Sequence, residues 1–99
     1  MSKETINICI PVFNEEKNLR DLFEKLSDFM SSGAKKYDIN FEIIFFDDGS
    51  TDNSRNMIEN FENAKVIFTN ENKGLGNAIK ALMLYTKNSE AIGMFKIDG

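Results

Sequence analysis

The sequence contains no histidine, and this absence excludes several classes of chemistry. Histidine is the commonest general base, so nucleophilic systems of the Ser-His-Asp or Cys-His type are excluded within these residues. The commonest zinc ligand is missing as well. One cysteine, Cys9, is present, so an internal disulfide is excluded and a reducing compartment is expected. Because Cys9 lies in an apolar run, we expect it to be a small buried hydrophobic residue.

Long hydrophobic runs and an excess of positive charge are also missing. No apolar run approaches the roughly 20 residues that span a bilayer, and "MSKETINICIPVF" lacks the layout of a signal peptide. The chain is therefore expected to be soluble and cytoplasmic. With 12 basic and 16 acidic residues, the net charge of −4 argues against a general nucleic-acid binder. A hydrophobic content of 41% predicts one packed domain over residues 1–99.

Hydrophobic periodicity predicts strands that alternate with helices along the whole chain. Strands are expected at 6–12, 41–46, 66–68 and 91–99. Helices are expected to follow with caps at Asn14, then at Ser50 or Thr51, and to start near Leu75, with Gly33 stopping the first helix. The order β-α-β-α-β-α-β predicts an α/β fold with a Rossmann-like parallel sheet and right-handed crossovers.

Polar residues and glycines collect where the expected strands end. These ends read "PVFNEE", "DDGSTD", "NENKGLG" and "KIDG", and open parallel sheets bind ligands beyond the carboxyl ends of their strands. Alternation should turn Asp47 and Asp48 to opposite faces, so that one faces a ligand and the other braces the turn at Gly49. The other interpretation is that "DGST" is only a turn followed by a helix cap.

Two further segments are candidates for phosphate and metal binding. In "NKGLGNA" a glycine-containing loop enters a helix, whose first N–H groups attract phosphate, and Lys73 adds positive charge. This segment matches neither G-x-G-x-x-G nor the P-loop pattern, so a plain helix-entry loop is an equal alternative. Asp98, at the expected end of the last strand, could ligate Mg²⁺ or Mn²⁺, or could be a solvated strand-end aspartate.

Taken together, "IPVFNEEKNL", "FEIIFFDDGSTDNS", "NKGLGNAIKAL" and "FKIDG" resemble the start of a family 2 glycosyltransferase of the GT-A fold. The resemblance covers nearly the whole chain, and its third block is similar to the polyprenyl-phosphate glycosyltransferases. It implies a strand order of 3-2-1-4 and a metal-dependent transferase. The donor would be a nucleotide-diphosphate sugar, UDP- or GDP-linked, and the acceptor a saccharide or a polyprenyl phosphate. A polyprenyl-phosphate acceptor would favour membrane association of the full-length protein.

The resemblance also assigns roles to individual residues. Pro11, Phe13 and Glu15 would line the nucleoside pocket. Asp48 would bind the base, with Asp47 as its supporting partner. Lys73 and Gly74 would lie near the ribose or diphosphate. Asp98 resembles the first aspartate of a D-x-D motif, which holds the metal and the sugar nucleotide.

The motif's second aspartate and the acceptor-binding half, with the usual catalytic base, have no counterpart before Gly99. We therefore expect the N-terminal, nucleotide-sugar-binding part of a GT-A domain, without catalytic residues of its own. Such a fragment of an inverting transferase is expected to be inactive alone and to self-associate through uncovered surface.

Other readings start from the same architecture. A small α/β nucleotide-binding or regulatory module without transferase activity is the alternative. A receiver-like module would need an aspartate after the third strand, where the chain reads "TNENKG". A nucleotidyltransferase would need a basic, glycine-rich loop after the first strand, where "PVFNEE" is acidic.

Overall fold

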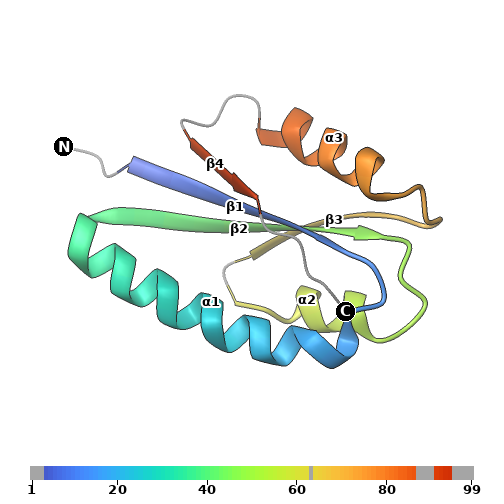
Figure 1. The fold of residues 1–99 in the computed structure, drawn as a ribbon, viewed down its shortest axis with the longest axis horizontal. Helices are drawn as coiled ribbons and strands as arrows, with labels where there is room; N and C mark the ends of the chain where they lie inside the picture. Colours follow the sequence, from blue (N-terminus) through green and yellow to red (C-terminus); the bar gives the residue numbers. More distant parts are fainter. Residues whose placement is uncertain (1–3, 63, 87–90, 95–99) are drawn as a thin grey trace.

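The computed structural model describes residues 4–62, 64–86 and 91–94, with backbone only for the last segment. The strands are β1 (Glu4–Val12), β2 (Ile39–Asp48), β3 (Ala64–Thr69) and β4 (Ala91–Met94). The helices between them are α1 (Glu16–Tyr37), α2 (Ser54–Glu59) and α3 (Leu75–Thr86) (Figure 1). The expected alternation of strands and helices is confirmed.

The strands form one parallel sheet in the order β3-β2-β1-β4. This confirms the order 3-2-1-4. β2 is a central strand, and apolar residues on both of its faces suit that buried position. The register pairs Val12 with Asp47 and Asp48 with Thr69. The carboxyl ends of β1, β2 and β3 therefore meet at one edge of the sheet.

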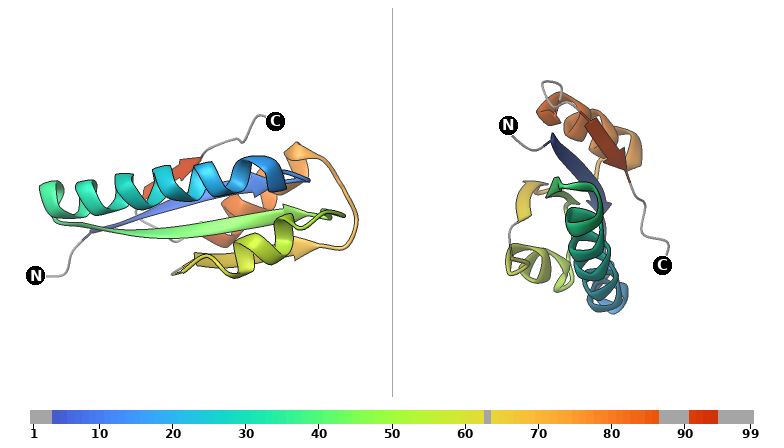
Figure 2. Two further views of the ribbon diagram at one scale, coloured as in Figure 1. Left: turned by 90° about the horizontal axis from the view of Figure 1, so that it is seen from below. Right: turned by 90° about the vertical axis from the view of Figure 1, so that its left-hand side faces the viewer.

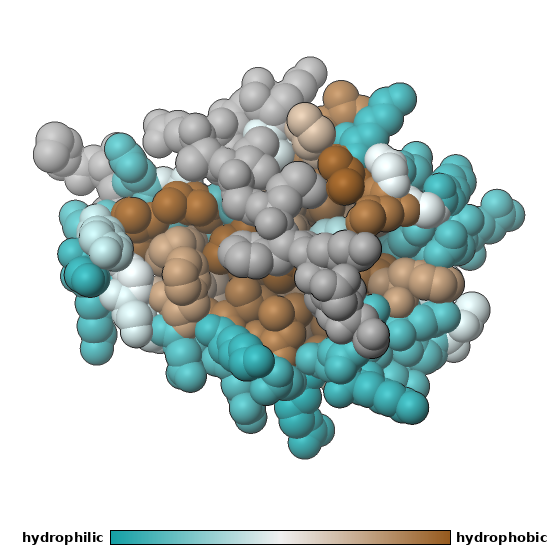
Figure 3. All heavy atoms as spheres, in the orientation of Figure 1, coloured by the Kyte–Doolittle hydropathy of each residue, from teal (hydrophilic) through white to brown (hydrophobic). Residues whose placement is uncertain are grey.

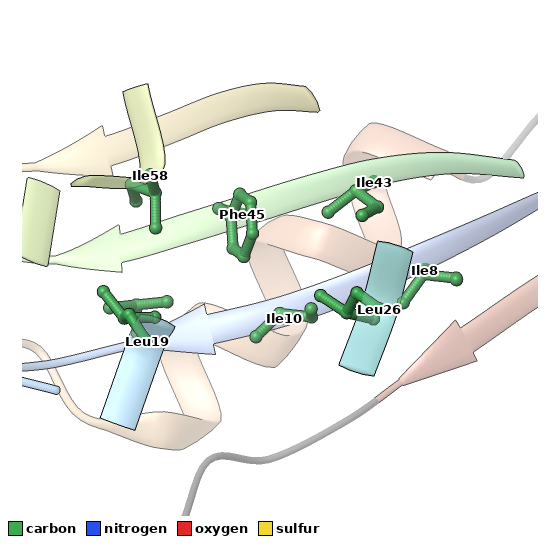
Figure 4. Close-up of a cluster of buried hydrophobic side chains, with 8 residues drawn as sticks. Ile8, Ile10, Leu19, Leu26, Ile43, Phe45 and Ile58 are labelled. Carbon is green, nitrogen blue, oxygen red and sulfur yellow. The ribbon is translucent and has the colours of Figure 1, made fainter. Parts of the chain in front are cut away.

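Helices cover both faces of the sheet (Figure 2). On the face covered by α1 and α2, the even-numbered residues of β1 and the odd-numbered residues of β2 pack into the larger core (Figure 4). Its buried members are Ile8, Ile10, Val12, Leu19, Leu26, Ile43, Phe45 and Ile58. On the α3 face, Cys9, Ile44 and Phe46 pack against Ala78 and Leu82. Cys9 is buried, as expected.

The first helix differs from its predicted bounds at both ends. It runs through Gly33 to Tyr37, so the prediction that Gly33 stops it was wrong. Gly33 instead lies against the ring of Phe41, which a Cβ at this position would meet at 3.0 Å. The helix ends at Asp38, whose φ of 55° is left-handed. Asn14 is not its cap either, since Glu15 is the N-cap residue and makes no side-chain capping bond.

The second helix begins later than expected, at Ser54, so the prediction of a cap at Ser50 or Thr51 was wrong. Asn53 is the N-cap residue and makes no side-chain capping bond. The Ser54 backbone N–H donates instead to Oδ1 of Asp52 at 2.8 Å. Asp47 and Asp48 are the last residues of β2 and do not belong to the turn.

Hydrophobic side chains are also exposed in the described part of the chain. In the space-filling view they gather in the middle of one face, with hydrophilic residues bordering them (Figure 3). On α3, Met83, Leu84 and Tyr85 are each at least half exposed. The expected self-association of the chain stays a prediction.

Candidate nucleotide-binding site

A cavity of about 220 Å³ opens at the carboxyl edge of the sheet, between β1, β2 and the start of α3. It is the space into which the ends of two strands and the entry to one helix converge. Its lining residues are Pro11, Val12, Phe13, Glu15, Asp48, Asn72, Gly74, Leu75 and Ala78.

The two adjacent aspartates occupy opposite faces of the sheet, as alternation requires. Asp48 shares the α3 face with Phe46 and lines the cavity, and its side chain is only 4% exposed. Asp47 shares the other face with Phe45 and is 1% exposed. Its Oδ2 accepts a hydrogen bond from the Ser50 N–H at 3.3 Å, while its buried Oδ1 has no protein partner. Asp47 therefore braces the turn and lies outside the cavity.

Asp48 is fixed by the loop that leads into α3. Its Oδ1 accepts the backbone N–H of Lys73 at 2.9 Å, and its Oδ2 accepts the N–H of Gly74 at 2.8 Å. An ionised carboxylate offers about four lone-pair sites. Oδ1 also lies 3.5 Å from the Thr69 hydroxyl. Oδ2, whose one protein partner is the Gly74 N–H, can therefore accept a second hydrogen bond from a ligand in the cavity.

Two glycines make this arrangement possible. Gly49 has a φ of 73°, and a Cβ there would lie 2.6 Å from the carbonyl carbon of Glu71 and 2.7 Å from the nitrogen of Asn72. Gly74 has a φ of 90°, and a Cβ there would meet nothing within 4 Å. The absence of a side chain at Gly49 therefore lets two backbone segments come into contact. At Gly74 the absence of a side chain matters only for the left-handed φ.

The structure brings together most of the site residues predicted from the sequence. Pro11, Phe13, Glu15, Asp48 and Gly74 line one cavity. Lys73 contributes its backbone N–H to Asp48 and has an exposed side chain. Asp98 lies outside the described residues.

Other lining residues were not predicted, namely Val12, Asn72, Leu75 and Ala78. Asn72 stands in the quoted segment "NENKGLG", so its position two residues before Gly74 was the available signal. Leu75 and Ala78 belong to the apolar pattern of α3, and nothing in that pattern separates cavity walls from core.

The described residues do not form a metal site by themselves. Among them, no three acidic or cysteine side chains lie close enough together to hold an ion. The cavity itself is lined by two carboxylates, those of Asp48 and Glu15. The predicted metal ligand is Asp98, which these observations do not reach. Within the same residues, no helix is long and apolar enough to cross a membrane.

Comparison of the sequence with known proteins places the chain in a family. Residues 7–93 match the model of the family described as "Glycosyl transferase family 2". A curated relative from Proteus mirabilis (strain HI4320), "Undecaprenyl-phosphate 4-deoxy-4-formamido-L-arabinose transferase", is 36% identical over 81 residues. That match covers 77% of this chain and 24% of the relative, so the chain spans about a quarter of that protein's length. The family match extends over most of the chain and includes both loops that carry the cavity, and the chain therefore belongs to glycosyltransferase family 2.

Proposed function

We propose that this chain provides the nucleoside-binding part of a glycosyltransferase that uses a nucleotide-diphosphate sugar as donor. One observation carries the proposal: the Asp48 carboxylate is held at the wall of a cavity by two backbone N–H groups, with acceptor capacity left over. A group that only accepts hydrogen bonds selects a base edge that carries an N–H. Uracil and guanine both present such an edge, which is consistent with a UDP- or GDP-linked donor.

The rest of the cavity suits a base and its ribose. Phe13 is 42% exposed at the cavity, so its ring is available for stacking on a base. Pro11 and Ala78 add apolar surface. A volume of about 220 Å³ is below the roughly 300–1,000 Å³ typical of whole-ligand pockets, so only part of a nucleotide sugar fits inside. The diphosphate would extend beyond the strand ends, toward the exposed Lys73 and the first turn of α3.

We also propose an acceptor, a mechanism and a location for the full-length protein. The relative's name identifies an undecaprenyl-phosphate sugar transferase, and we extend a polyprenyl-phosphate acceptor, with an inverting transfer, to the full-length protein. In an inverting transfer the acceptor oxygen would bond to the anomeric carbon as the bond to the nucleoside diphosphate breaks. An ionised phosphate oxygen can attack without a base, whereas a hydroxyl acceptor would need one, and no residue of this chain is assigned that role. A lipid-linked acceptor would bring the reaction to the cytoplasmic face of a membrane. Mg²⁺ or Mn²⁺, held through Asp98, would supply Lewis-acid stabilisation of the leaving diphosphate.

Calorimetric titration of the chain with UDP and with GDP, each with and without Mn²⁺, tests the proposal. We expect saturable binding of one nucleotide, and loss of that binding in Asp48→Ala. Asp28→Ala, which removes an exposed carboxylate from α1, is the matched control and should bind as the unmodified chain does. Equal binding of the nucleotide by Asp48→Ala would overturn the assignment of the cavity.

A further inference from the structure

Asn14 stands between two residues of the cavity wall without belonging to the wall itself. Phe13 and Glu15, its neighbours in the chain, both line the cavity. Asn14 has a φ of 50°, in the left-handed region that asparagine tolerates better than most residues. The chain therefore turns sharply at Asn14, and this turn determines where both wall residues lie.

The side chain and the N–H of Asn14 hold the loop that follows β2. The Asn14 N–H donates to Oγ of Ser50 at 2.9 Å. In return, Oδ1 of Asn14 accepts the N–H of Thr51 at 2.8 Å and the N–H of Asp52 at 3.3 Å. Residues 36 to 38 positions apart in the sequence are joined in this way.

The loop after β2 holds the start of α1 in turn. Oγ of Ser54, which is fully buried, accepts the Glu15 N–H at 2.7 Å. Oδ2 of Asp52 accepts the Glu16 N–H at 3.3 Å. The first N–H groups of a helix need partners from outside it, and these come from the other loop. The two loops thus provide hydrogen-bond acceptors for each other's backbone N–H groups. We use the term loop clasp for the hydrogen bonds that join residues 14–16 to Ser50, Thr51, Asp52 and Ser54.

We propose that Asn14 is a positioning residue for the nucleoside pocket, acting through the loop clasp. The clasp joins the loop that carries Phe13 and Glu15 to the strand end that carries Asp48. It thereby sets the separation between the ring that stacks on the base and the carboxylate that accepts its N–H. This inference rests on the proposed function, since it assigns a role toward the same nucleotide.

The expected signature is an effect on affinity that exceeds the effect on stability. The bonds to Oδ1 of Asn14 are exposed, so water can replace them when the side chain is removed. The fold then loses little. The two walls of the pocket, however, are then no longer held at a fixed separation. Nucleotide binding must order them, and this entropic cost weakens the affinity.

Asn14→Gly and Asn14→Asp separate the side-chain acceptor from the backbone turn. Glycine keeps the left-handed φ without strain and removes Oδ1. Aspartate keeps an acceptor at the same place. Asn60→Gly is the matched control, because Asn60 makes a comparable exposed bond, from Nδ2 to the Asn56 carbonyl at 2.7 Å, away from the cavity.

The experiment measures the Kd of the full chain for UDP and for GDP by calorimetry, with the Tm of each variant. We expect Asn14→Gly to bind the preferred nucleotide about 3- to 10-fold more weakly, the equivalent of one or two net hydrogen bonds. Asn14→Asp should retain most of the affinity, and Asn60→Gly all of it. Unchanged affinity in Asn14→Gly, or an equal loss in Asn60→Gly or Asn14→Asp, would overturn the positioning role alone. If the unmodified chain bound neither nucleotide, the proposed function would fail, and this role with it.

Discussion

Oδ2 of Asp48 accepts the backbone N–H of Gly74 at 2.8 Å, across 26 residues of sequence. The bond ties the end of β2 to the entry of α3, and a second bond from the Lys73 N–H to Oδ1 closes the same contact. The residue assigned to the ligand is thus also the residue that organises the neighbouring wall. Ligand affinity and local stability should therefore change together at this position.

Asp48→Asn tests this double role. The amide keeps one acceptor oxygen but turns its NH₂ group toward a backbone N–H that has lost its partner. A buried donor without a partner costs about 1–3 kcal/mol, so we expect a lower free energy of unfolding by that amount and loss of nucleotide binding. Urea denaturation and calorimetric titration measure the two effects. Wild-type stability in Asp48→Asn would show that the Asp48 bonds do not organise the loop.

The glycines beside the cavity should respond differently to the same substitution. Gly49→Ala combines a left-handed φ with a clash against the backbone of Glu71 and Asn72, which cannot move without displacing the cavity wall. Gly74→Ala has the left-handed φ but open space around it, so its cost should be about 1–2 kcal/mol. We expect Gly49→Ala to be the more destabilised variant in thermal unfolding. Equal Tm values would mean that the Gly49 contact is not tight in solution.

The fold was predictable from the sequence because its signals are local and repeated. The alternation in β1, the apolar run in β2 and the helix stripes each follow from which faces must be buried. Even the separation of Asp47 from Asp48 follows from the period of a strand. These features do not depend on knowing which distant residues meet.

The predictions that were wrong concern single residues whose contacts are long-range. Asn14 and Ser50 are residue types that commonly cap their own helices, and the structure uses both across loops instead. Gly33 usually signals a helix end, yet here it makes room for the ring of Phe41. In each case a long-range contact overrides a local preference, and a single sequence does not reveal which residues are in contact.

Cys9 should be unreactive while the chain is folded. Its side chain is fully buried, and burial raises the pKa of the thiol above its ordinary value, although the hydrogen bond with Thr86 opposes this. The reactive thiolate is therefore scarce as well as inaccessible. Labelling with a thiol-specific reagent at pH 8 should proceed only as fast as the protein opens, and should accelerate sharply in urea. Rapid stoichiometric labelling of the native chain would contradict the buried position of β1.

Asp52 should make the loop clasp sensitive to acid. Burial raises the pKa of its carboxyl, but hydrogen bonds from Ser54 and the Glu16 N–H outweigh this, and the pKa lies below its ordinary value of 3.8. A carboxyl with a lowered pKa in the folded state stabilises the fold above the unfolded pKa, near 3.9. That contribution decreases as the pH falls through the folded-state pKa.

The comparison of Asp52→Asn with the unmodified chain isolates this contribution. At pH 7 the variant should be less stable by about 0.3–1 kcal/mol, the usual contribution of a negative charge beside a helix N-terminus. The difference should stay constant down to about pH 5 and shrink below about pH 4, as the Asp52 carboxyl becomes protonated first in the unfolded chain and then, at lower pH, in the folded chain. Asp28→Asn, on the exposed surface of α1, controls for the loss of one negative charge. A stability difference that persists unchanged at pH 2 would show that Asp52 acts through its shape and not through its charge.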